Sequence, residues 1–245
     1  MEKTVIVTPT YNERENIALL IPEIFALHPD IYVVVVDDSS PDGTGDLVLS
    51  LAEKYPHLSL FSRPTKQGLG EAYKAGMTKV LKDPDVTRVI TMDADGSHAA
   101  QYLAAMLEKS ATHDVVIGSR YVKGGGIAAW EAWRYALSAG GNLYARFITG
   151  LPINDMTAGF MCFNAHLLRQ LPLSRMHAAG YAFLMEIKFE IIYSLKGSVT
   201  EVPIIFQSRR GGESKISQQI VREGLKVPWR LLFRRFTKRP IATQS

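Results

Sequence analysis

The sequence predicts an α/β fold in which helices flank a mostly parallel central sheet. In the first half of the 245-residue chain, short apolar runs rich in β-branched residues alternate with segments of helical apolar spacing. The apolar runs are continuous, as strands covered on both faces of a parallel sheet require. Strand and helix signals that alternate in this way are typical of right-handed βαβ units.

The expected elements of the first half follow one another without long gaps. We expect strands at residues 4–8, 31–36, 58–62, 87–92 and 114–118. The expected helices are residues 15–27, 44–55, 70–81 and 101–110. The first helix shows the pattern most clearly, because its apolar residues fall on one face. They are Ile17, Leu20, Ile21, Ile24 and Leu27.

The second half is less regular. Helices are expected at 130–149 and 181–195, a loop followed by a strand at 153–163, and a strand at 198–208. Residues 209–215 are expected to form a polar loop, and 218–236 is a mixed apolar and basic stretch. No repeat or convincing linker interrupts the chain. We therefore expect one catalytic domain over 1–216 and a basic amphipathic segment over 217–245.

Composition limits the class of protein. Apolar residues make up 47% of the chain, which is enough for a sizeable core. The single cysteine, Cys162, excludes an intramolecular disulfide framework and fits a reducing compartment. The longest stretch without Asp, Glu, Lys or Arg, residues 156–168, is shorter than the roughly 18 residues of a membrane span. The N-terminus resembles a strand and not a signal peptide, so we expect a cytoplasmic protein without a transmembrane helix.

Polar residues gather directly after the expected strands. The carboxyl ends of parallel strands are where open α/β sheets bind ligands, so five such clusters on one edge predict a site. The clusters are Pro9–Glu13, Asp37–Gly43, Lys66–Gly70, Asp93–Asp95 and Ser119–Arg120.

Asp93 and Asp95 indicate a divalent metal at this edge. The sequence contains neither GxGxxG nor GxxxxGK[ST], so the usual glycine-rich phosphate cradles are absent. Two carboxylates can instead bind substrate phosphates through Mg²⁺ or a similar ion. A solvated loop after a strand is the alternative interpretation, and spacing alone does not decide between the two.

Several motifs in order resemble the inverting family 2 glycosyltransferases of GT-A fold, with a Rossmann-like, mostly parallel central sheet. They are Pro9–Glu13, Val36–Thr44, Gly68–Gly70, Asp93–Asp95 and Gly118–Tyr121. Motifs in the second half narrow the resemblance to polyprenol (dolichol) phosphate mannose synthases. These are Thr157–Phe160, Gly180–Phe183 with Glu186, and Arg209–Lys215. The similarity extends over roughly residues 4–216.

The resemblance implies a role for each matching residue. Asp95 would bind Mg²⁺ or Mn²⁺ directly, with Asp93 and Ser97 beside it, and Asp38 would accept hydrogen bonds from the base. The residues implied in nucleotide-sugar binding are Pro9, Tyr11, Glu13, Val36, Asp38, Asp93, Ala94, Asp95, Arg120, Arg209 and Lys215. Ser97 departs from the pattern, because close relatives often have Gln there. A serine hydroxyl is a shorter and weaker ligand, so water would replace it.

The implied reaction transfers a sugar, most simply mannose from GDP-mannose, to a polyprenyl monophosphate. The second pKa of a phosphate is about 6, so this nucleophile is ionised at neutral pH and hardly needs a general base. Cations must instead offset the repulsion between donor and acceptor phosphates. The residues expected at the acceptor phosphate are Arg120, Arg134, Ser138 and Arg209. Asp95, Arg120, Asp155 and Arg209 are the expected catalytic residues. Asp155 either orients the acceptor, acts as base or caps a turn.

The C-terminal segment predicts peripheral contact with the cytoplasmic face of a membrane. Its basic residues repeat every four positions and its apolar neighbours include Trp229 and Phe233, as in an interfacial helix. Pro228 is expected to kink this helix. The basic residues are Arg222, Lys226, Arg230, Arg234, Arg235, Lys238 and Arg239. An ordinary surface helix and an anchor supplied by a membrane partner protein are the alternatives.

Three functions stay open at this stage. The first is the polyprenyl-phosphate mannosyltransferase. The second is a family 2 transferase that uses UDP-glucose or acts on a polysaccharide hydroxyl. The third is a non-catalytic binder of nucleotides or nucleic acid, although the paired acidic residues would repel phosphates without a metal and aromatic stacking motifs are missing. We therefore expect no nucleic-acid partner.

Overall fold

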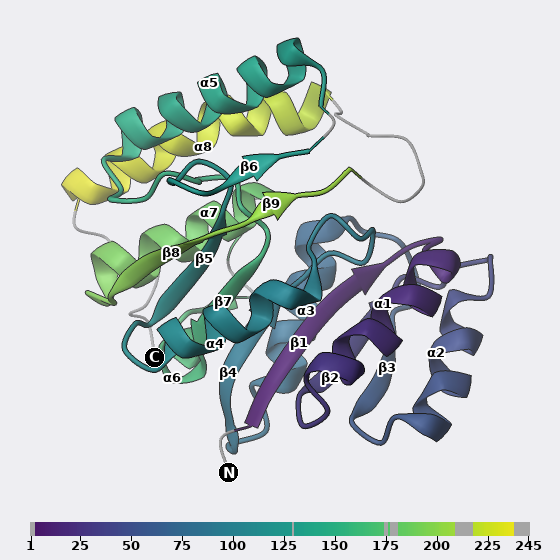
Figure 1. The fold of residues 1–245 in the computed structure, drawn as a ribbon. Coiled ribbons are helices and arrows are strands. Elements are labelled where there is room, and N and C mark those ends of the chain that lie inside the picture. The colour runs from purple at the N-terminus through teal and green to yellow at the C-terminus, as the bar shows by residue number, and fades with distance from the viewer. Residues whose placement is uncertain (1–2, 129, 174–175, 177–180, 209–217, 238–245) are drawn as a thin grey trace.

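The computed structural model describes residues 3–128, 130–173, 176, 181–208 and 218–237. The strands of its main sheet are β1 (Lys3–Thr10), β2 (Tyr32–Asp37), β3 (Leu58–Ser62), β4 (Val86–Thr91), β5 (Val115–Ser119), β7 (Met161–Asn164) and β8 (Val199–Pro203). They lie in the order β3-β2-β1-β4-β7-β5-β8 (Figure 1). Only β7 runs antiparallel to its neighbours. The predicted α/β fold with a mostly parallel sheet is therefore confirmed.

Helices cover both faces of this sheet. The helices are α1 (Arg14–Leu27), α2 (Thr44–Lys54), α3 (Leu69–Val80), α4 (Leu103–Ser110), α5 (Ala132–Thr149), α6 (Ala165–Arg169), α7 (Tyr181–Phe189) and α8 (Gln218–Thr237). Short 3₁₀ and π-helical turns, Ala100–Tyr102 and Glu190–Ser194, precede α4 and extend α7. Apolar side chains of α1, α2 and α4 pack on one face, and those of α3, α6 and α7 pack on the other.

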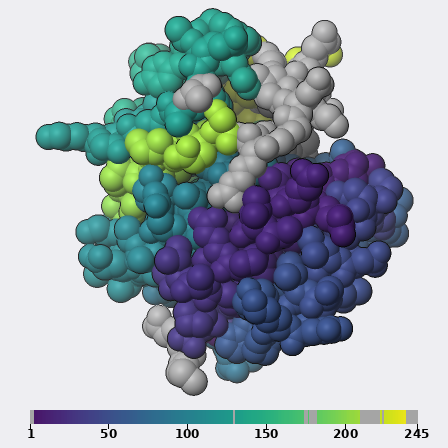
Figure 2. Space-filling model, turned by 45° about the vertical axis from the view of Figure 1, so that its right-hand side comes forward, coloured from purple at the N-terminus to yellow at the C-terminus, as the bar shows by residue number. Residues whose placement is uncertain are grey.

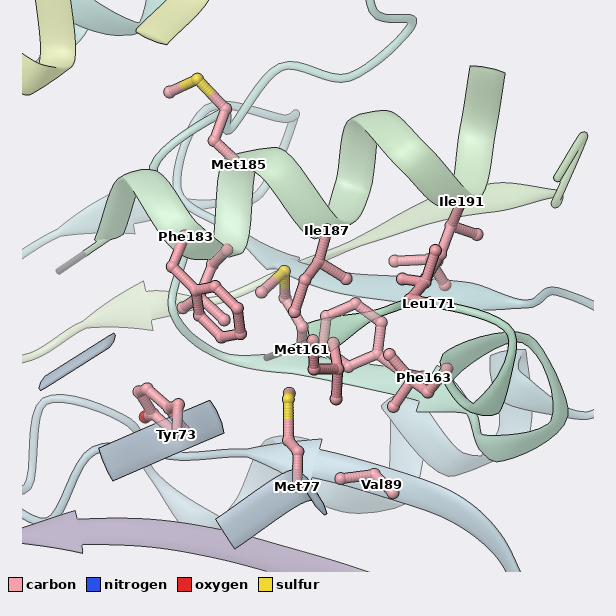
Figure 3. Close-up of a cluster of buried hydrophobic side chains, with 14 of the residues drawn as sticks. Tyr73, Met77, Val89, Met161, Phe163, Leu171, Phe183, Met185, Ile187 and Ile191 are labelled. Carbon is pink, nitrogen blue, oxygen red and sulfur yellow. The ribbon is translucent and has the colours of Figure 1, made fainter. Parts of the chain in front are cut away.

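The face beneath α7 holds the larger core. Phe183 and Ile187 of α7 point toward Tyr73 and Met77 of α3 and toward Met161 of β7 (Figure 3). All five side chains are fully buried. The alternation of strand residues between two packed faces explains why the strand sequences are continuously apolar.

The second half departs from the pattern expected of repeated βαβ units. β7 enters between β4 and β5 in the antiparallel direction, and the short helix α6 follows it directly. The stretch expected as a single strand over 198–208 divides into β8 and β9 (Ile205–Phe206). β9 leaves the main sheet and pairs with β6 (Gly126–Ile127) in a small sheet of its own. These changes give the second half its irregular sequence pattern.

Helices α5 and α8 form an outer layer, side by side, beyond α7 (Figure 1). α8 contributes Val227 and Leu231 to the same buried core as the sheet, and Pro228 lies within the helix. Among the residues described, no helix combines the length and the apolarity that crossing a bilayer requires. The space-filling view shows α5 in teal at the top, above the purple and blue first half of the chain (Figure 2).

Candidate active site

The residues expected to form a site gather at the carboxyl edge of the main sheet. Thr10 at the end of β1 lies opposite Asp37 at the end of β2, and its hydroxyl donates a 2.8 Å hydrogen bond to that carboxylate. β4 ends on the other side of β1, where the Met92 N–H donates to the Val7 carbonyl at 3.2 Å. Three neighbouring strands therefore end together, as expected of a ligand site in an open sheet.

Asp38 lies next to a buried arginine. Nη1 of Arg63, on the loop after β3, is 2.9 Å from the Asp38 carboxylate, and Nη2 donates to Gln67 at 2.9 Å. Burial raises the pKa of the Asp38 carboxyl above its ordinary value, and the Arg63 charge opposes this shift. Arg63 was not among the residues expected from the sequence. The available signal was a cation placed directly after a predicted strand.

Tyr11 and Glu13 lie on the loop between β1 and α1. The Lys66 ammonium lies 3.7 Å from the centre of the Tyr11 ring. Glu13 accepts a 2.6 Å hydrogen bond from the Asn16 side chain, and its N–H donates to the Thr44 hydroxyl at 3.1 Å. The loops after β1, β2 and β3 are thus linked around the expected nucleoside site.

Pro9 and Val36 are more deeply buried than Tyr11 and Glu13. They are opposite one another in the pairing of β1 with β2, and both are buried. The Val36 side chain packs so closely on α3 that a Cβ at Gly76 would lie 2.7 Å from its Cγ2. This side chain belongs to the core, which leaves the Val36 backbone for the expected nucleoside contact.

Asp93 and Asp95 follow β4 and are each 7% exposed. The Tyr73 hydroxyl of α3 donates a 2.6 Å hydrogen bond to Asp93, a contact that sequence analysis missed. Ser97 donates to Asp95 from its N–H at 3.0 Å and from its hydroxyl at 2.6 Å. Gly96, at φ +78°, makes the turn that returns Ser97 to this carboxylate. Ser97 therefore orients Asp95 here, and its role as a metal ligand stays a prediction.

A buried histidine supports this turn. Nδ1 of His98 accepts the Asp93 N–H at 2.9 Å, and its ring stacks on Phe160 with centres 5.0 Å apart. Burial lowers the pKa of the His98 imidazole, so the ring is neutral and carries its proton on Nε2. Ala94, between the two aspartates, is also buried.

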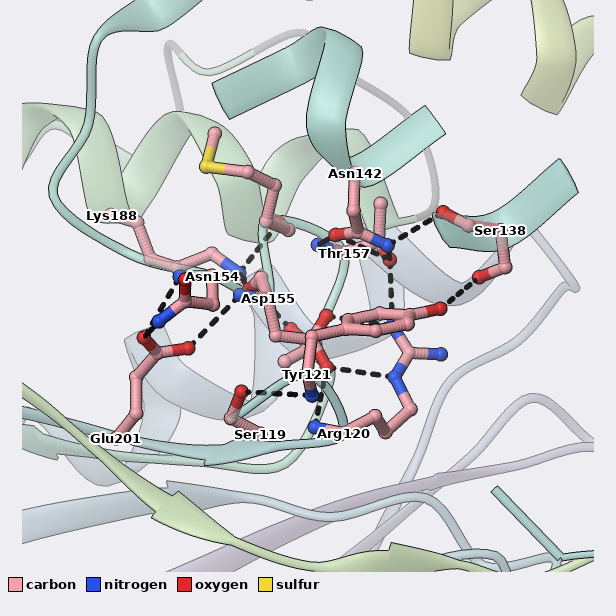
Figure 4. A network of polar contacts seen from close by, with 12 residues as sticks. Ser119, Arg120, Tyr121, Ser138, Asn142, Asn154, Asp155, Thr157, Lys188 and Glu201 are labelled. Atoms are coloured by element: carbon pink, nitrogen blue, oxygen red, sulfur yellow. Dashed lines mark hydrogen bonds and ion pairs between the residues drawn. The ribbon is translucent and has the colours of Figure 1, made fainter. Parts of the chain in front are cut away.

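Arg120, directly after β5, is fixed by Asp155 (Figure 4). Its Nε and Nη2 donate 2.7 Å hydrogen bonds to the two carboxylate oxygens, and its backbone N–H donates at 3.0 Å. Nη2 also donates to the Thr157 hydroxyl at 2.7 Å. Burial by itself raises the pKa of Asp155, but the charge and hydrogen bonds of Arg120 outweigh it and hold the pKa below its usual value. This arrangement favours an orienting role for Asp155 over that of a general base.

Two residues expected near the acceptor lie on α5. Ser138 accepts a 2.8 Å hydrogen bond from the Tyr121 hydroxyl, and the Tyr121 ring centre is 5.2 Å from the Arg120 guanidinium carbon. Ser138 is therefore connected to Arg120 through one aromatic ring. The Arg134 guanidinium carbon lies 5.2 Å from the centre of the Trp130 ring.

Arg209 and Lys215 lie outside the described residues. The described chain before them passes close to the site, because the Gln207 N–H donates to the Ser97 carbonyl at 3.2 Å. The Phe206 ring centre is 5.4 Å from the Arg120 guanidinium carbon. Glu186, part of the second-half motifs that carry the resemblance, forms a 2.6 Å ion pair with Arg234 of α8.

Comparison with known proteins identifies the family. A model of glycosyl transferase family 2 matches residues 5–172. The chain belongs to this family. A polyprenol monophosphomannose synthase of Mycolicibacterium smegmatis is 40% identical over 226 residues, which are 91% of this chain and 84% of that protein. An undecaprenyl-phosphate mannosyltransferase of Micrococcus luteus is 41% identical over 224 residues, 91% of each chain.

A third relative of this glycosyltransferase is longer. The chain is 35% identical to a dolichol-phosphate mannosyltransferase of Pyrococcus furiosus over 94% of its own length, and covers 64% of that protein. Among solved structures, glucosyl-3-phosphoglycerate synthase of Mycobacterium tuberculosis with phosphoglyceric acid superposes with a TM-score of 0.68 at 17% identity, covering 96% of this chain and 80% of that one. A Pyrobaculum calidifontis mannosyltransferase, solved with GDP-Man and Mn²⁺, gives 0.56 at 16%, covering 99% and 76%. These likenesses support the expected GT-A fold.

Proposed function

We propose that this family 2 glycosyltransferase transfers mannose from GDP-mannose to a polyprenyl monophosphate, with inversion at the anomeric carbon. The observation that carries the proposal is the identity of 40% and 41% over 91% of the chain to two enzymes named for polyprenyl-phosphate mannose synthesis. The guanine donor is suggested further by the mannosyltransferase of similar fold solved with GDP-Man.

The buried pair of Asp38 and Arg63 suits a nucleobase. A carboxylate accepts the N–H groups of guanine, and a guanidinium donates to its ring and carbonyl acceptors. The 2.9 Å ion pair holds the two side chains in one place before the donor arrives. Tyr11, Glu13 and the backbone of Val36 complete the proposed nucleoside contacts, with Pro9 beneath them.

Asp93 and Asp95 suit a divalent metal on the donor diphosphate. Carboxylate oxygens are the ligands that Mg²⁺ and Mn²⁺ prefer. Within the described part of the chain, no group of three or more His, Cys, Asp or Glu side chains is arranged to hold a metal alone. Substrate oxygens and water would complete the coordination, and the ion would neutralise charge on the leaving diphosphate. Tyr73 and Ser97 hold the two carboxylates in position for it.

Arg120 is the proposed cation for the acceptor phosphate, with Arg134, Ser138 and Arg209 as its proposed partners. An ionised phosphate needs little activation, so the chief task of the site is to hold two anions in line. Asp155 and Thr157 fix the direction of the Arg120 guanidinium. The low pKa of Asp155 fits a reaction in which no side chain removes a proton from the nucleophile.

The proposed lipid acceptor suggests that the α5 and α8 layer contacts the membrane. Both helices expose large apolar side chains, including Phe147 at 81% and Phe236 at 74% exposure. The other exposed large apolar side chains of the two helices are Trp133, Tyr135, Leu137, Leu143, Leu225, Trp229 and Phe233. Exposed basic residues of α8 accompany it, namely Arg222, Lys226, Arg230 and Arg235. Apolar and basic side chains together suit anionic lipid, and we propose peripheral binding to the cytoplasmic face.

The test is an assay of the purified protein with labelled nucleotide sugars, a short polyprenyl phosphate and Mg²⁺ or Mn²⁺. We expect a lipid-linked mannose product from GDP-mannose and its loss when EDTA removes the metal. A product formed from UDP-glucose instead would show that GDP-mannose is not the donor. A product formed on a polysaccharide hydroxyl would show that polyprenyl phosphate is not the acceptor. Nucleotide binding without turnover of any donor would refute the enzyme.

A further inference from the structure

Lys188 is an ionisable residue in the interior that has no part in the proposed reaction. It lies on α7 with 0% exposure. Its ammonium donates hydrogen bonds to the carbonyls of Asp155 at 3.4 Å, Met156 at 2.7 Å and Ala158 at 3.3 Å (Figure 4). Burial lowers the pKa of Lys188 to about 7, although Asp155 opposes this shift. A lysine buried at this cost needs an explanation beyond the filling of space.

The three carbonyls belong to the loop between α5 and β7. Glu201 of β8 binds the opposite polar groups of the same loop. Its carboxylate accepts the N–H of Asn154 at 2.8 Å, the Asn154 side chain at 2.7 Å and the N–H of Asp155 at 3.0 Å. Lysine takes the carbonyls and glutamate takes the N–H groups, so residues 154–158 are fixed from two elements of the core. A loop held in this way has one conformation.

Residues 154–158 in turn hold Arg120. Asp155 accepts two side-chain hydrogen bonds from the guanidinium and one from the Arg120 backbone, and Thr157 accepts a fourth. Thr157 is itself bonded to Asn142 of α5 at 3.1 Å, through its own N–H. The direction of the Arg120 side chain therefore depends on the path of this loop.

We propose that Lys188, with Glu201, is a positioning residue that fixes loop 154–158 and through it aims the Arg120 guanidinium at the acceptor phosphate. This inference rests on the proposed function, because that function supplies the phosphate. It assigns to Lys188 no contact with either substrate. Its loss should therefore weaken the use of the acceptor and leave donor binding intact.

The test compares Lys188→Met with the matched control Arg88→Met. Arg88 also donates to backbone carbonyls, those of Thr87 and Ser110, but lies at the opposite end of β4 from the site. For Lys188→Met we expect the KM for polyprenyl phosphate to rise by about tenfold or more, since small misplacements of a reacting group cost up to about 100-fold. The Kd for GDP with Mn²⁺ should stay within about twofold of wild type, the usual range for changes at distant, uncoupled sites. Arg88→Met should change neither constant.

A double variant locates the effect. If Lys188 acts through the loop, Lys188→Met combined with Asp155→Asn raises the acceptor KM no further than the larger single change. The proposal would be overturned if the two changes together multiplied their separate effects on the acceptor KM. An unchanged acceptor KM in Lys188→Met, or an equal loss of donor affinity, would also overturn it. Should Lys188→Met fail to fold, Glu201→Gln tests the same loop from its other side, with the same expected rise in acceptor KM. A wild-type protein that forms no lipid-linked product would refute the proposed function instead, before any variant is compared.

Discussion

The role expected of Ser97 changed once its contact with Asp95 was known. From the sequence, Ser97 was a weak substitute for a missing amide ligand. In the structure its hydroxyl and N–H both donate to Asp95, at 2.6 and 3.0 Å. Two donors on one oxygen fix the direction of the carboxylate. Asp95 is thereby prepared for a cation whose other ligands come from substrate.

Asp95→Asn should abolish the metal dependence of donor binding. The amide keeps the size of the side chain but loses the charge that a hard divalent cation requires. In calorimetry, wild-type protein should bind GDP more tightly when Mn²⁺ is added, and the variant should bind GDP equally with and without it. Turnover should be lost, while the unfolding temperature should stay near that of wild type.

Ser97→Ala is the companion of this variant, since it removes the orienting hydroxyl and leaves Asp95 unchanged. We expect weakened but detectable metal dependence. A variant Asp95→Asn that retains normal turnover would remove Asp95 from the metal site. Mn²⁺ that stays bound to nucleotide-free wild-type protein through dialysis would show that further protein groups complete the coordination.

The residues that follow strands were predictable, but the pairs that they form were not. Asp38, Asp93 and Arg120 stand at strand ends, a position that a parallel sheet turns into a site. Their partners Arg63, Tyr73 and Asp155 are distant in the sequence and meet them only in the fold. Periodicity describes which face a residue occupies, but it holds no information about such pairs.

At the scale of elements, the parallel strands β1 to β5 were predictable because each is a short stretch rich in apolar and β-branched residues between turn signals. β7 was expected as a strand, but its antiparallel direction was not. Direction depends on how the connection through α5 returns to the sheet, which local sequence does not specify. The short helix α6 was missed because its five residues are too few for a helical period to show.

α7 performs two tasks on two sides. Lys188 points to the site loop, whereas Glu186 and Glu190 bind α8 through Arg234, at 2.6 and 3.3 Å. Positions 186 and 188 differ by about 200° around a helix, so these faces are opposite. Burial raises the pKa of Glu190, and the Ser194 hydroxyl and Arg234 oppose the shift. The pair of carboxylates therefore depends on Arg234 for its charge balance.

Arg234→Met should destabilise the protein by about 3–5 kcal/mol, because it leaves two buried carboxylates without their cation. Arg230→Met is the matched control on the same helix. The Arg230 side chain is 43% exposed and lies 3.8 Å from Glu186, so its loss should cost less than about 1 kcal/mol. Urea unfolding of both variants at pH 7 measures the difference. Equal costs would mean that the buried pairing contributes nothing special to holding α8.

At the scale of the whole molecule, α5 connects the site to the exposed apolar surface. Toward the site, Ser138 and Asn142 bind Tyr121 and Thr157. Away from it, α5 exposes Trp133, Leu137 and Phe147. A phosphate held at Arg120 would thus lie beneath a helix whose outer side chains suit lipid. From the sequence, a lipid contact was predicted for the C-terminal segment alone. The proposal that α5 shares this contact rests on its packing beside α8.

The two faces of α8 favour the proposed lipid contact over an ordinary surface helix. Val227 and Leu231 are buried in the core. Leu225, Trp229 and Phe233 are exposed and fall within about 80° of one another on the helix, away from the buried pair. A helix that only packs on its domain needs one apolar face, so the second one suits the proposed apolar environment of a lipid surface.

The membrane contact is best tested with point variants, since deletion of α8 would also remove Val227 and Leu231 from the core. We expect the combined changes Trp133→Ser, Phe147→Ser, Trp229→Ser and Phe233→Ser to lower partitioning into anionic vesicles by about tenfold or more, because each buried large apolar side chain contributes about 1.5–3 kcal/mol. The control is a double variant, Leu19→Ser with Leu49→Ser. These two leucines lie on α1 and α2 and are each 56% exposed. Sedimentation with vesicles measures both.

The charge of the vesicles separates the two parts of this surface. Each Lys or Arg near an anionic membrane contributes about 1 kcal/mol, so wild-type binding should weaken on neutral vesicles and in high salt. The apolar variant should keep that salt dependence at a lower level of binding, because its arginines are unchanged. If the wild type and the control partition into anionic vesicles no better than the variant with four serine substitutions, the α5 and α8 surface does not bind lipid directly. An ordinary surface helix and an anchor supplied by a membrane partner protein would then be the alternatives.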